Sequence, residues 1–201
     1  MKKGLSCFLV LFLFMNLAIS PSYPQSKIWK LSRDDSRIKF SIKYLMFGKI
    51  KGEFHEFDAT IISDKPDFSE AEIEINIYTN SIETGNEKRD IDLKSESLFY
   101  VEKYPEMVFH DKQIKLVKEN IYKISGELSI KDITRKVILD AKYRGKSTAE
   151  NGQMIAEWQI SLVIKRSNFG LKLSRVKEFF ADDKVKIDIE ASFLLLRGDA
   201  K

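Results

Sequence analysis

The chain has 201 residues, with 34 lysines and arginines against 30 aspartates and glutamates, two histidines and one cysteine. Charges of both signs interleave along the sequence, so the net charge of +4 argues weakly for nucleic-acid binding. The single cysteine excludes a disulfide framework, and the wide separation of His55 and His110 argues against a metal site built on histidines.

The first 26 residues have the pattern of a secretory signal peptide. Two lysines precede an almost unbroken apolar run from Leu5 to Met15, which is too short for a membrane span of about 20 residues. Cleavage is predicted between residues 20 and 26, and it would remove the only cysteine. We therefore expect an exported protein, periplasmic or secreted, whose mature chain is a single domain over residues 27–201 that does not span a membrane.

Eight segments of the mature chain alternate between apolar and polar residues, as strands with one buried face do. They span residues 36–44, 53–62, 71–77, 107–117, 122–131, 136–144, 154–164 and 185–195. Residues 87–99 break this alternation, and Ile91, Leu93 and Leu98 among charged residues predict a short amphipathic helix there. Residues 145–152 are rich in small and polar residues and are expected to form a hairpin loop.

Strands with one apolar face and little helix to cover it leave two folds, a β-sandwich and a closed β-barrel. Several segments are about ten residues long, or roughly 30–40 Å, which favours the tilted strands of a barrel. The sequence therefore predicts an all-β protein, an extended antiparallel barrel of eight strands with one short helix inserted at about residues 87–99. A barrel of this size can be filled by its own side chains or can hold a small ligand, and the sequence leaves that choice open.

Twelve apolar side chains are expected to point into the barrel, as packed core or as the lining of a ligand cavity. They are Phe40, Ile42, Phe54, Phe57, Ile73, Ile75, Phe109, Ile124, Leu128, Trp158, Ile160 and Phe193. The sequence contains no nucleophile elbow, glycine-rich phosphate loop or metal-ligand spacing, and it calls for no cofactor. Asp90 and Asp92 could act as paired catalytic carboxylates, although acids early in a helix are explained more simply by the helix dipole.

An ordered set of short motifs between Trp29 and Leu195 resembles the YceI-like family of bacterial lipid-binding proteins. The motifs are Ser36-Arg-Ile-Lys-Phe40, Gly52-Glu-Phe54, Ser81-Ile-Glu-Thr84, Arg89-Asp90, Leu98-Phe99, Lys103-Tyr-Pro105, Gly126-Glu-Leu-Ser-Ile130, Thr134-Arg135 and Arg166-Ser-Asn-Phe-Gly-Leu171. The resemblance implies a lipocalin-like barrel in periplasmic or secreted proteins, some of which hold a long isoprenoid chain inside. Where the family often has histidines, this chain has Lys43-Tyr44 and Asp92.

The resemblance implies a non-enzymatic periplasmic carrier or store for a polyisoprenoid or quinone-like lipid. Specificity would then come from polar residues at the barrel mouth, for which the candidates are Arg89, Thr134, Arg135, Arg166 and Asn168. The same residues also fit a solvated turn and a structural arginine. Two alternatives remain: a filled barrel that acts in protein interaction or stress response, and an enzyme that modifies an isoprenoid through Arg89, Asp90 or Asp92. The choice between monomer and homodimer stays open.

Overall fold

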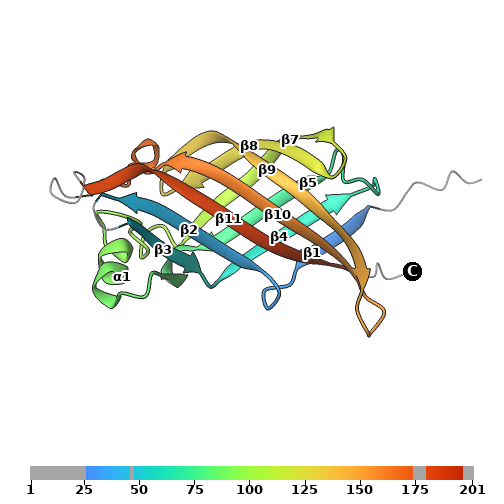
Figure 1. The fold of residues 1–201 in the computed structure, drawn as a ribbon, viewed down its shortest axis with the longest axis horizontal. Helices are drawn as coiled ribbons and strands as arrows, with labels where there is room; N and C mark the ends of the chain where they lie inside the picture. Colours follow the sequence, from blue (N-terminus) through green and yellow to red (C-terminus); the bar gives the residue numbers. More distant parts are fainter. Residues whose placement is uncertain (1–25, 46–47, 174–179, 197–201) are drawn as a thin grey trace, which may run out of the picture.

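The computed structural model describes residues 26–45, 48–173 and 180–196, which form an elongated antiparallel β-barrel (Figure 1). The predicted all-β class, barrel and single short helix are confirmed. The strands are β1 (Lys27–Leu31), β2 (Arg37–Tyr44), β3 (Gly48–Phe54), β4 (Phe57–Ser63), β5 (Glu72–Tyr78), β6 (Ile82–Glu83), β7 (Glu106–Lys118), β8 (Ile121–Ile130), β9 (Ile133–Thr148), β10 (Met154–Lys165) and β11 (Ala181–Leu195). The other elements are the helix α1 (Glu87–Lys94) and the 3-10 turns η1 (Thr79–Ser81) and η2 (Arg166–Phe169).

The predicted signal peptide, apart from its last residue, lies outside the described residues.

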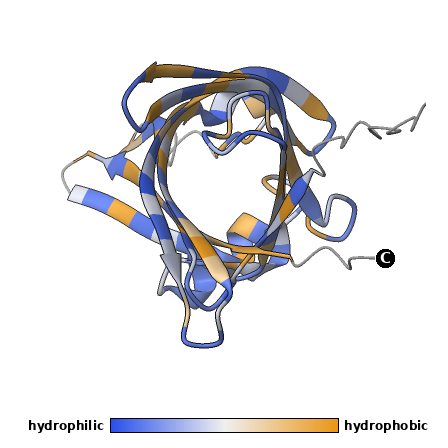
Figure 2. Ribbon diagram, turned by 90° about the vertical axis from the view of Figure 1, so that its right-hand side faces the viewer, coloured by the Kyte–Doolittle hydropathy of each residue, from blue (hydrophilic) through white to orange (hydrophobic). Residues whose placement is uncertain are grey.

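Eight strands close the barrel in the order β1-β4-β5-β7-β8-β9-β10-β11, and β11 returns to β1 through pairs such as Phe193 with Leu31. Viewed along its axis, the barrel is a complete ring of strands on which apolar and polar residues alternate (Figure 2). At one end β11 pairs with β2 instead of β1, and β3 and β6 continue the wall from β2. The helix α1 lies beside β3 and β6 at this end (Figure 1), which we call the α1 end.

The segment predicted as one strand over residues 53–62 is two strands, β3 and β4, separated by His55 and Glu56. Phe54 and Phe57 lie three positions apart, so strict alternation would place them on opposite faces of one strand. The break between the strands instead lets both rings point inward, where they are 7% and 3% exposed. A bend in this position therefore explains how a sequence with irregular spacing still buries both rings.

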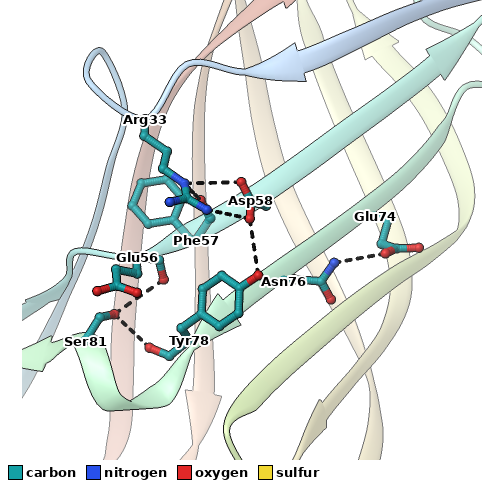
Figure 3. Close-up of polar contacts among 8 residues, drawn as sticks. All are labelled: Arg33, Glu56, Phe57, Asp58, Glu74, Asn76, Tyr78 and Ser81. Carbon is teal, nitrogen blue, oxygen red and sulfur yellow. Dashed lines mark hydrogen bonds and ion pairs between the residues drawn. The ribbon is translucent and has the colours of Figure 1, made fainter.

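Polar contacts on the outer surface hold the chain at this bend (Figure 3). Arg33, between β1 and β2, donates to the Asp58 carboxylate at 2.6 Å from Nη2 and to the carbonyl of Phe57 at 3.1 Å from Nε. The Tyr78 hydroxyl also donates to Asp58, and the Ser81 hydroxyl donates to the carbonyl of Tyr78. The Asp58 carboxylate raises the pKa of Arg33 through its hydrogen bond and its charge. These contacts join the β1–β2 connection to β4 and to the end of β5.

The helix is shorter than predicted, because α1 ends at Lys94 and not at residue 99. The Asn86 side chain caps its start by accepting a hydrogen bond from the backbone nitrogen of Arg89 at 3.0 Å. Extended backbone at Ser95 ends it, and the Ser95 hydroxyl donates to the carbonyl of Asp92 at 2.6 Å. None of the eight residues of α1 is buried, so its contacts with β6 and its caps fix its position.

The carboxyl group of Asp111, at a bulge in β7, accepts a hydrogen bond from the backbone nitrogen of Ile73 at 2.6 Å. Partial burial raises the pKa of Asp111, and this effect outweighs the hydrogen bond, which lowers it. At pH values below the ordinary pKa of aspartate, the protonated carboxyl therefore makes its full contribution to the stability of the fold. That contribution is lost as the pH rises through the raised pKa.

We expect Asp111→Asn to raise the melting temperature at neutral pH by a few degrees, because asparagine keeps the acceptor for Ile73 without the charge. The gain should shrink towards zero near about pH 3, where the aspartate is protonated in both the folded and the unfolded chain. Thermal unfolding followed by circular dichroism at both pH values checks this. An equal gain at both pH values would contradict it.

Candidate functional site

A cavity of about 650 Å³ occupies the α1 end of the barrel. Its wall is mostly apolar and is built from β2, β3, β5 to β8, β10 and β11, together with α1 and the turns that follow α1 and η2. The apolar lining residues are Ile38, Phe40, Ile42, Ile50, Phe54, Ile77, Ile82, Leu93, Leu98, Phe99, Met107, Leu128, Ile130, Ile164, Leu171, Leu173, Ala181, Val185 and Ile187. Most lie at alternate strand positions, as inward residues of a barrel do.

Close backbone approach shapes one wall of the cavity. Phe40 on β2 lies opposite Gly52 on β3, and a Cβ atom at Gly52 would come within 2.4 Å of the Phe40 ring. The absence of a side chain at Gly52 therefore lets the Phe40 ring approach β3 closely, where it packs on Phe54 with 5.6 Å between ring centroids. This arrangement keeps both rings against the wall and leaves the interior beside them open.

Seven polar residues line the cavity: Thr84, Asn86, Lys88, Arg89 and Asp92 in α1 or just before it, Tyr44 at the end of β2, and Arg166 in η2. Arg89 is partly buried, and Nε donates to the Thr84 hydroxyl at 2.7 Å while Nη2 donates to the Thr84 carbonyl at 2.9 Å. The Thr84 hydroxyl in turn donates to Asp90. These two hydrogen bonds to Thr84 fix the guanidinium of Arg89 at the cavity boundary. No carboxylate of the described residues forms an ion pair with it.

Arg166 is the second arginine on the cavity boundary and is 5% exposed. Its Nη1 donates to the carbonyl of Leu171 at 3.0 Å, and its Nε donates to the carbonyl of Asp182 at 3.3 Å. The guanidinium therefore ties η2 to the start of β11. Burial raises the pKa of Asp183, but the hydrogen bonds that Ser167 donates to its carboxylate and the nearby charge of Arg166 together hold that pKa below the usual range.

Two of the five predicted mouth residues, Arg89 and Arg166, line the cavity, and three do not. Thr134 and Arg135 are exposed at the start of β9, where the Thr134 hydroxyl hydrogen-bonds to that of Ser129 at 2.8 Å. Asn168 is exposed in η2. Thr134 and Arg135 therefore lie on a strand and Asn168 on a 3-10 turn, and all three are exposed outside the cavity.

Of the twelve predicted lining residues, Phe40, Ile42, Phe54 and Leu128 line the cavity. Seven others are buried in the remainder of the barrel, which we call the packed half: Phe57, Ile75, Phe109, Ile124, Trp158, Ile160 and Phe193. Ile73 is partly buried at its edge. Sequence reasoning missed the lining residues Leu93, Leu98, Phe99, Leu171 and Leu173 because they lie in a helix and in turns that have no strand periodicity. It also left out lining residues on strands, such as Ile38 and Ile187, because alternation does not give their depth in the barrel.

An aromatic cluster fills the far end of the packed half: Trp29, Phe68, Tyr122, Tyr143 and Trp158. Phe68, from the connection between β4 and β5, is 2% exposed and lies 5.5 Å from Trp29 and 5.2 Å from Trp158 between ring centroids. Tyr122 and Tyr143 complete the cluster at 5.2 and 4.9 Å from Trp158. The Nε1 atom of Trp158 is buried without a hydrogen-bond partner among the described residues.

Strands β8 and β9 hold the β4–β5 connection over this cluster. The Tyr122 hydroxyl donates to the carbonyl of Asp67 at 2.7 Å, and Lys146 Nζ donates to the carbonyl of Pro66 at 2.9 Å. The Lys146 ammonium also lies 4.8 Å from the centroid of the Phe68 ring. Burial lowers the pKa of Lys146 and raises that of Tyr122. The far end of the barrel is therefore closed by hydrogen-bonded backbone and aromatic rings.

Across residues 26–45, 48–173 and 180–196, no group of three or more histidine, cysteine, aspartate or glutamate side chains could hold a metal ion. No helix in the same ranges is long and apolar enough to cross a membrane. The cavity at the α1 end is the candidate site because its wall is mostly apolar, whereas a second pocket, lined by residues such as Ile62, Glu72 and His110, is more polar.

Comparison with known proteins places the whole barrel in one group. Residues 29–193 match the YceI-like domain. A UPF0312 protein of Staphylococcus aureus is 33% identical over 162 residues, which cover 79% of this chain and 92% of the relative. The crystal structure of Burkholderia cenocepacia BcnA superposes with a TM-score of 0.72 at 20% identity, covering 81% of this chain and 98% of BcnA. A polyisoprenoid binding domain from Saccharophagus degradans superposes with a TM-score of 0.62 at 14% identity, covering 84% and 98%.

Proposed function

The chain belongs to the YceI-like family, and from that premise we propose that it is a non-enzymatic carrier or store that holds a long apolar lipid inside its barrel. The observation that carries the proposal is the cavity of about 650 Å³ with an apolar wall and a polar boundary at one end. That volume lies within the range of about 300–1,000 Å³ typical of small-molecule sites. The name of the Saccharophagus degradans domain supports a polyisoprenoid as the lipid, and a quinone with an isoprenoid tail fits the same shape.

The energetics favour a chain-like ligand. Each methylene group that leaves water for the cavity gains about 0.8 kcal/mol. Part of this gain is offset by the ordering of a flexible chain and by the loss of free motion on binding. An apolar chain therefore supplies most of the affinity, and polar groups at the α1 end select the head group. We propose that the head lies beside Arg89 and Arg166 and that the chain points towards Ile187.

The proposal includes export to the periplasm, which the lysines and the apolar run near the N-terminus support. It also includes a lipid, and no nucleic acid, as the partner. Two further hypotheses compete with it. A filled barrel without a ligand is disfavoured by the open volume at the α1 end. Of the two acids that an isoprenoid-modifying enzyme would use, Asp92 lines the cavity, whereas Asp90 does not and accepts a hydrogen bond from the Thr84 hydroxyl.

Native mass spectrometry of the exported protein tests the proposed function. We expect the purified protein to carry an isoprenoid-type lipid, and lipid-free protein to take up geranylgeraniol from a mild detergent in a one-to-one complex. The same spectra give the oligomeric state. Protein that is purified without lipid and also takes up no added prenol or quinone would refute the carrier and favour the filled barrel.

Arg89 provides a test of the head-group end. We expect Arg89→Met to weaken binding of geranylgeranyl phosphate by about tenfold or more, because a charge-assisted hydrogen bond contributes about 1.5–3 kcal/mol. Geranylgeraniol, which lacks the charge, should lose much less. The matched control is Arg135→Met, which removes an exposed arginine outside the cavity and should change neither affinity. Equal losses for both ligands in Arg89→Met would instead show that Arg89 only supports the fold of the Thr84 turn.

A further inference from the structure

The cavity and the packed half meet at the same depth on several strands. On β11 the cavity is lined as far as Ile187, whereas Ile189 and the inward residues after it are packed. On β7 it is lined by Met107 but not by Phe109, the next inward residue. On β8 it is lined by Leu128, which lies directly opposite Phe109. A boundary therefore crosses the barrel at one level.

The ring of Phe109 forms part of this boundary. It lies across Gly126 on β8, since a Cβ atom at Gly126 would come within 2.4 Å of Phe109 Cζ and within 2.5 Å of Cε2. Phe109 is 4% exposed, and the inward residues Ile124 and Ile160 of the packed half are 3% and 7% exposed. The Phe109 ring therefore packs on the wall over Gly126, and it is the first inward side chain of β7 beyond the cavity.

Beyond this ring side chains fill the barrel axis towards its far end, and a pocket lined in part by Ile73 and Ile114 opens at the side, between β5 and β7. The aromatic cluster around Phe68 and Trp158 fills the interior, and Tyr122 and Lys146 bind the β4–β5 connection over it. Native interiors of this kind are packed about as densely as organic crystals. A chain that enters at the α1 end therefore meets a solid boundary partway along the barrel.

We propose that this boundary, of which Phe109 over Gly126 forms a part, sets the greatest length of lipid chain that the barrel can hold. The inference rests on the proposed function and adds the chain length for which the cavity is specific, because the ligand is then a prenyl-type chain of moderate length. The lined part of β11 runs from Ala181 to Ile187, or about 20 Å of strand at about 3.3 Å per residue. With a strand tilt of about 40°, this is about 15 Å along the barrel axis.

A fixed depth predicts how affinity depends on chain length. Each added methylene that enters the cavity strengthens binding by up to about fourfold, and one that stays outside adds nothing. The dissociation constant should therefore fall from farnesol to geranylgeraniol and should fall no further for solanesol, whose chain is much longer. Displacement of a fluorescent prenyl probe from the full chain, with each alcohol in the same mild detergent, measures all three constants.

Two variants should move the limit in opposite directions. Phe109→Leu removes ring atoms at the boundary. In this variant the dissociation constant of solanesol should be lower than that of geranylgeraniol by a factor of about three or more. Ile187→Phe adds bulk just above the boundary, so geranylgeraniol should bind about tenfold more weakly while farnesol changes little. The matched control is Phe193→Leu, which makes the same change in the packed half, far from the cavity, and should leave the order of the three alcohols as in the wild type.

The outcomes separate this inference from the proposed function. If the wild-type protein binds none of the three alcohols, both the proposed carrier function and the proposed length limit are refuted. Wild-type affinity that keeps rising to solanesol, with no change in Phe109→Leu or Ile187→Phe, would overturn the limit and leave the carrier function standing. Thermal melting of all variants shows that each is folded, and Ile187→Phe keeps the test decisive should Phe109→Leu fold poorly.

Discussion

Replacing Ile42 by tryptophan is expected to lower the affinity for geranylgeraniol by about a hundredfold while the barrel stays folded. Ile42 lies on β2, is only partly buried and lines the cavity, so the larger ring can occupy open space. It would displace about four methylene groups of the ligand, at about 0.8 kcal/mol each. The loss of roughly 3 kcal/mol corresponds to that change in dissociation constant. Probe displacement measures it, and chemical unfolding measures the stability of the variant.

The same substitution in the packed half is the matched control. Ile61 is 3% exposed, lies opposite Trp29 in the β1–β4 pairing and does not line the cavity. Ile61→Trp should therefore destabilise the protein by about 1–3 kcal/mol through overpacking, with ligand affinity nearly unchanged in the folded fraction. If Ile42→Trp loses stability but binds geranylgeraniol as the wild type does, the ligand is not held in this cavity.

Most of the barrel could be predicted because alternation records which face of a strand is buried. Ile160, Leu162 and Ile164 on β10 are all buried between exposed or partly exposed neighbours, as the sequence predicts. Strand β1 was not predicted, because Trp29 is its one buried residue and its neighbours are exposed or partly exposed. Phe68 escaped for a different reason: it is buried from a turn, with a φ of +58°, where no periodicity marks its side chain.

The cavity itself could be predicted only in part. Phe40 and Trp158 both follow the inward alternation, yet Phe40 lines the cavity and Trp158 belongs to the aromatic cluster. Alternation gives the face of a strand, whereas depth along the barrel depends on register and tilt, which come from pairing with strands far away in sequence. Arg89 was identified through the resemblance to the family. Its hydrogen bonds to Thr84 depend on where α1 docks, which no local pattern encodes.

Gly126 affects both the stability of the barrel and the position of the Phe109 ring at the cavity boundary. The residue has no positive φ, so the reason for a glycine there is steric and not conformational. A Cβ atom would come within 2.4 Å both of the Phe109 ring and of the carbonyl oxygen of His110 on the neighbouring strand. The ring can move towards the cavity, but the carbonyl belongs to the β7–β8 ladder and cannot move without breaking it.

Gly126→Val is therefore expected to lower the free energy of unfolding by about 3 kcal/mol, as denaturant unfolding would show. The variant should regain part of this loss when combined with Phe109→Leu, since the smaller side chain relieves the contact with the ring and not the contact with the His110 carbonyl. Ser125→Val, on the outer face one position earlier, is the control and should cost well under 1 kcal/mol. If the two changes at 126 and 109 were simply additive, the ring would not lie over Gly126, and the boundary of the cavity would have to be sought in other residues.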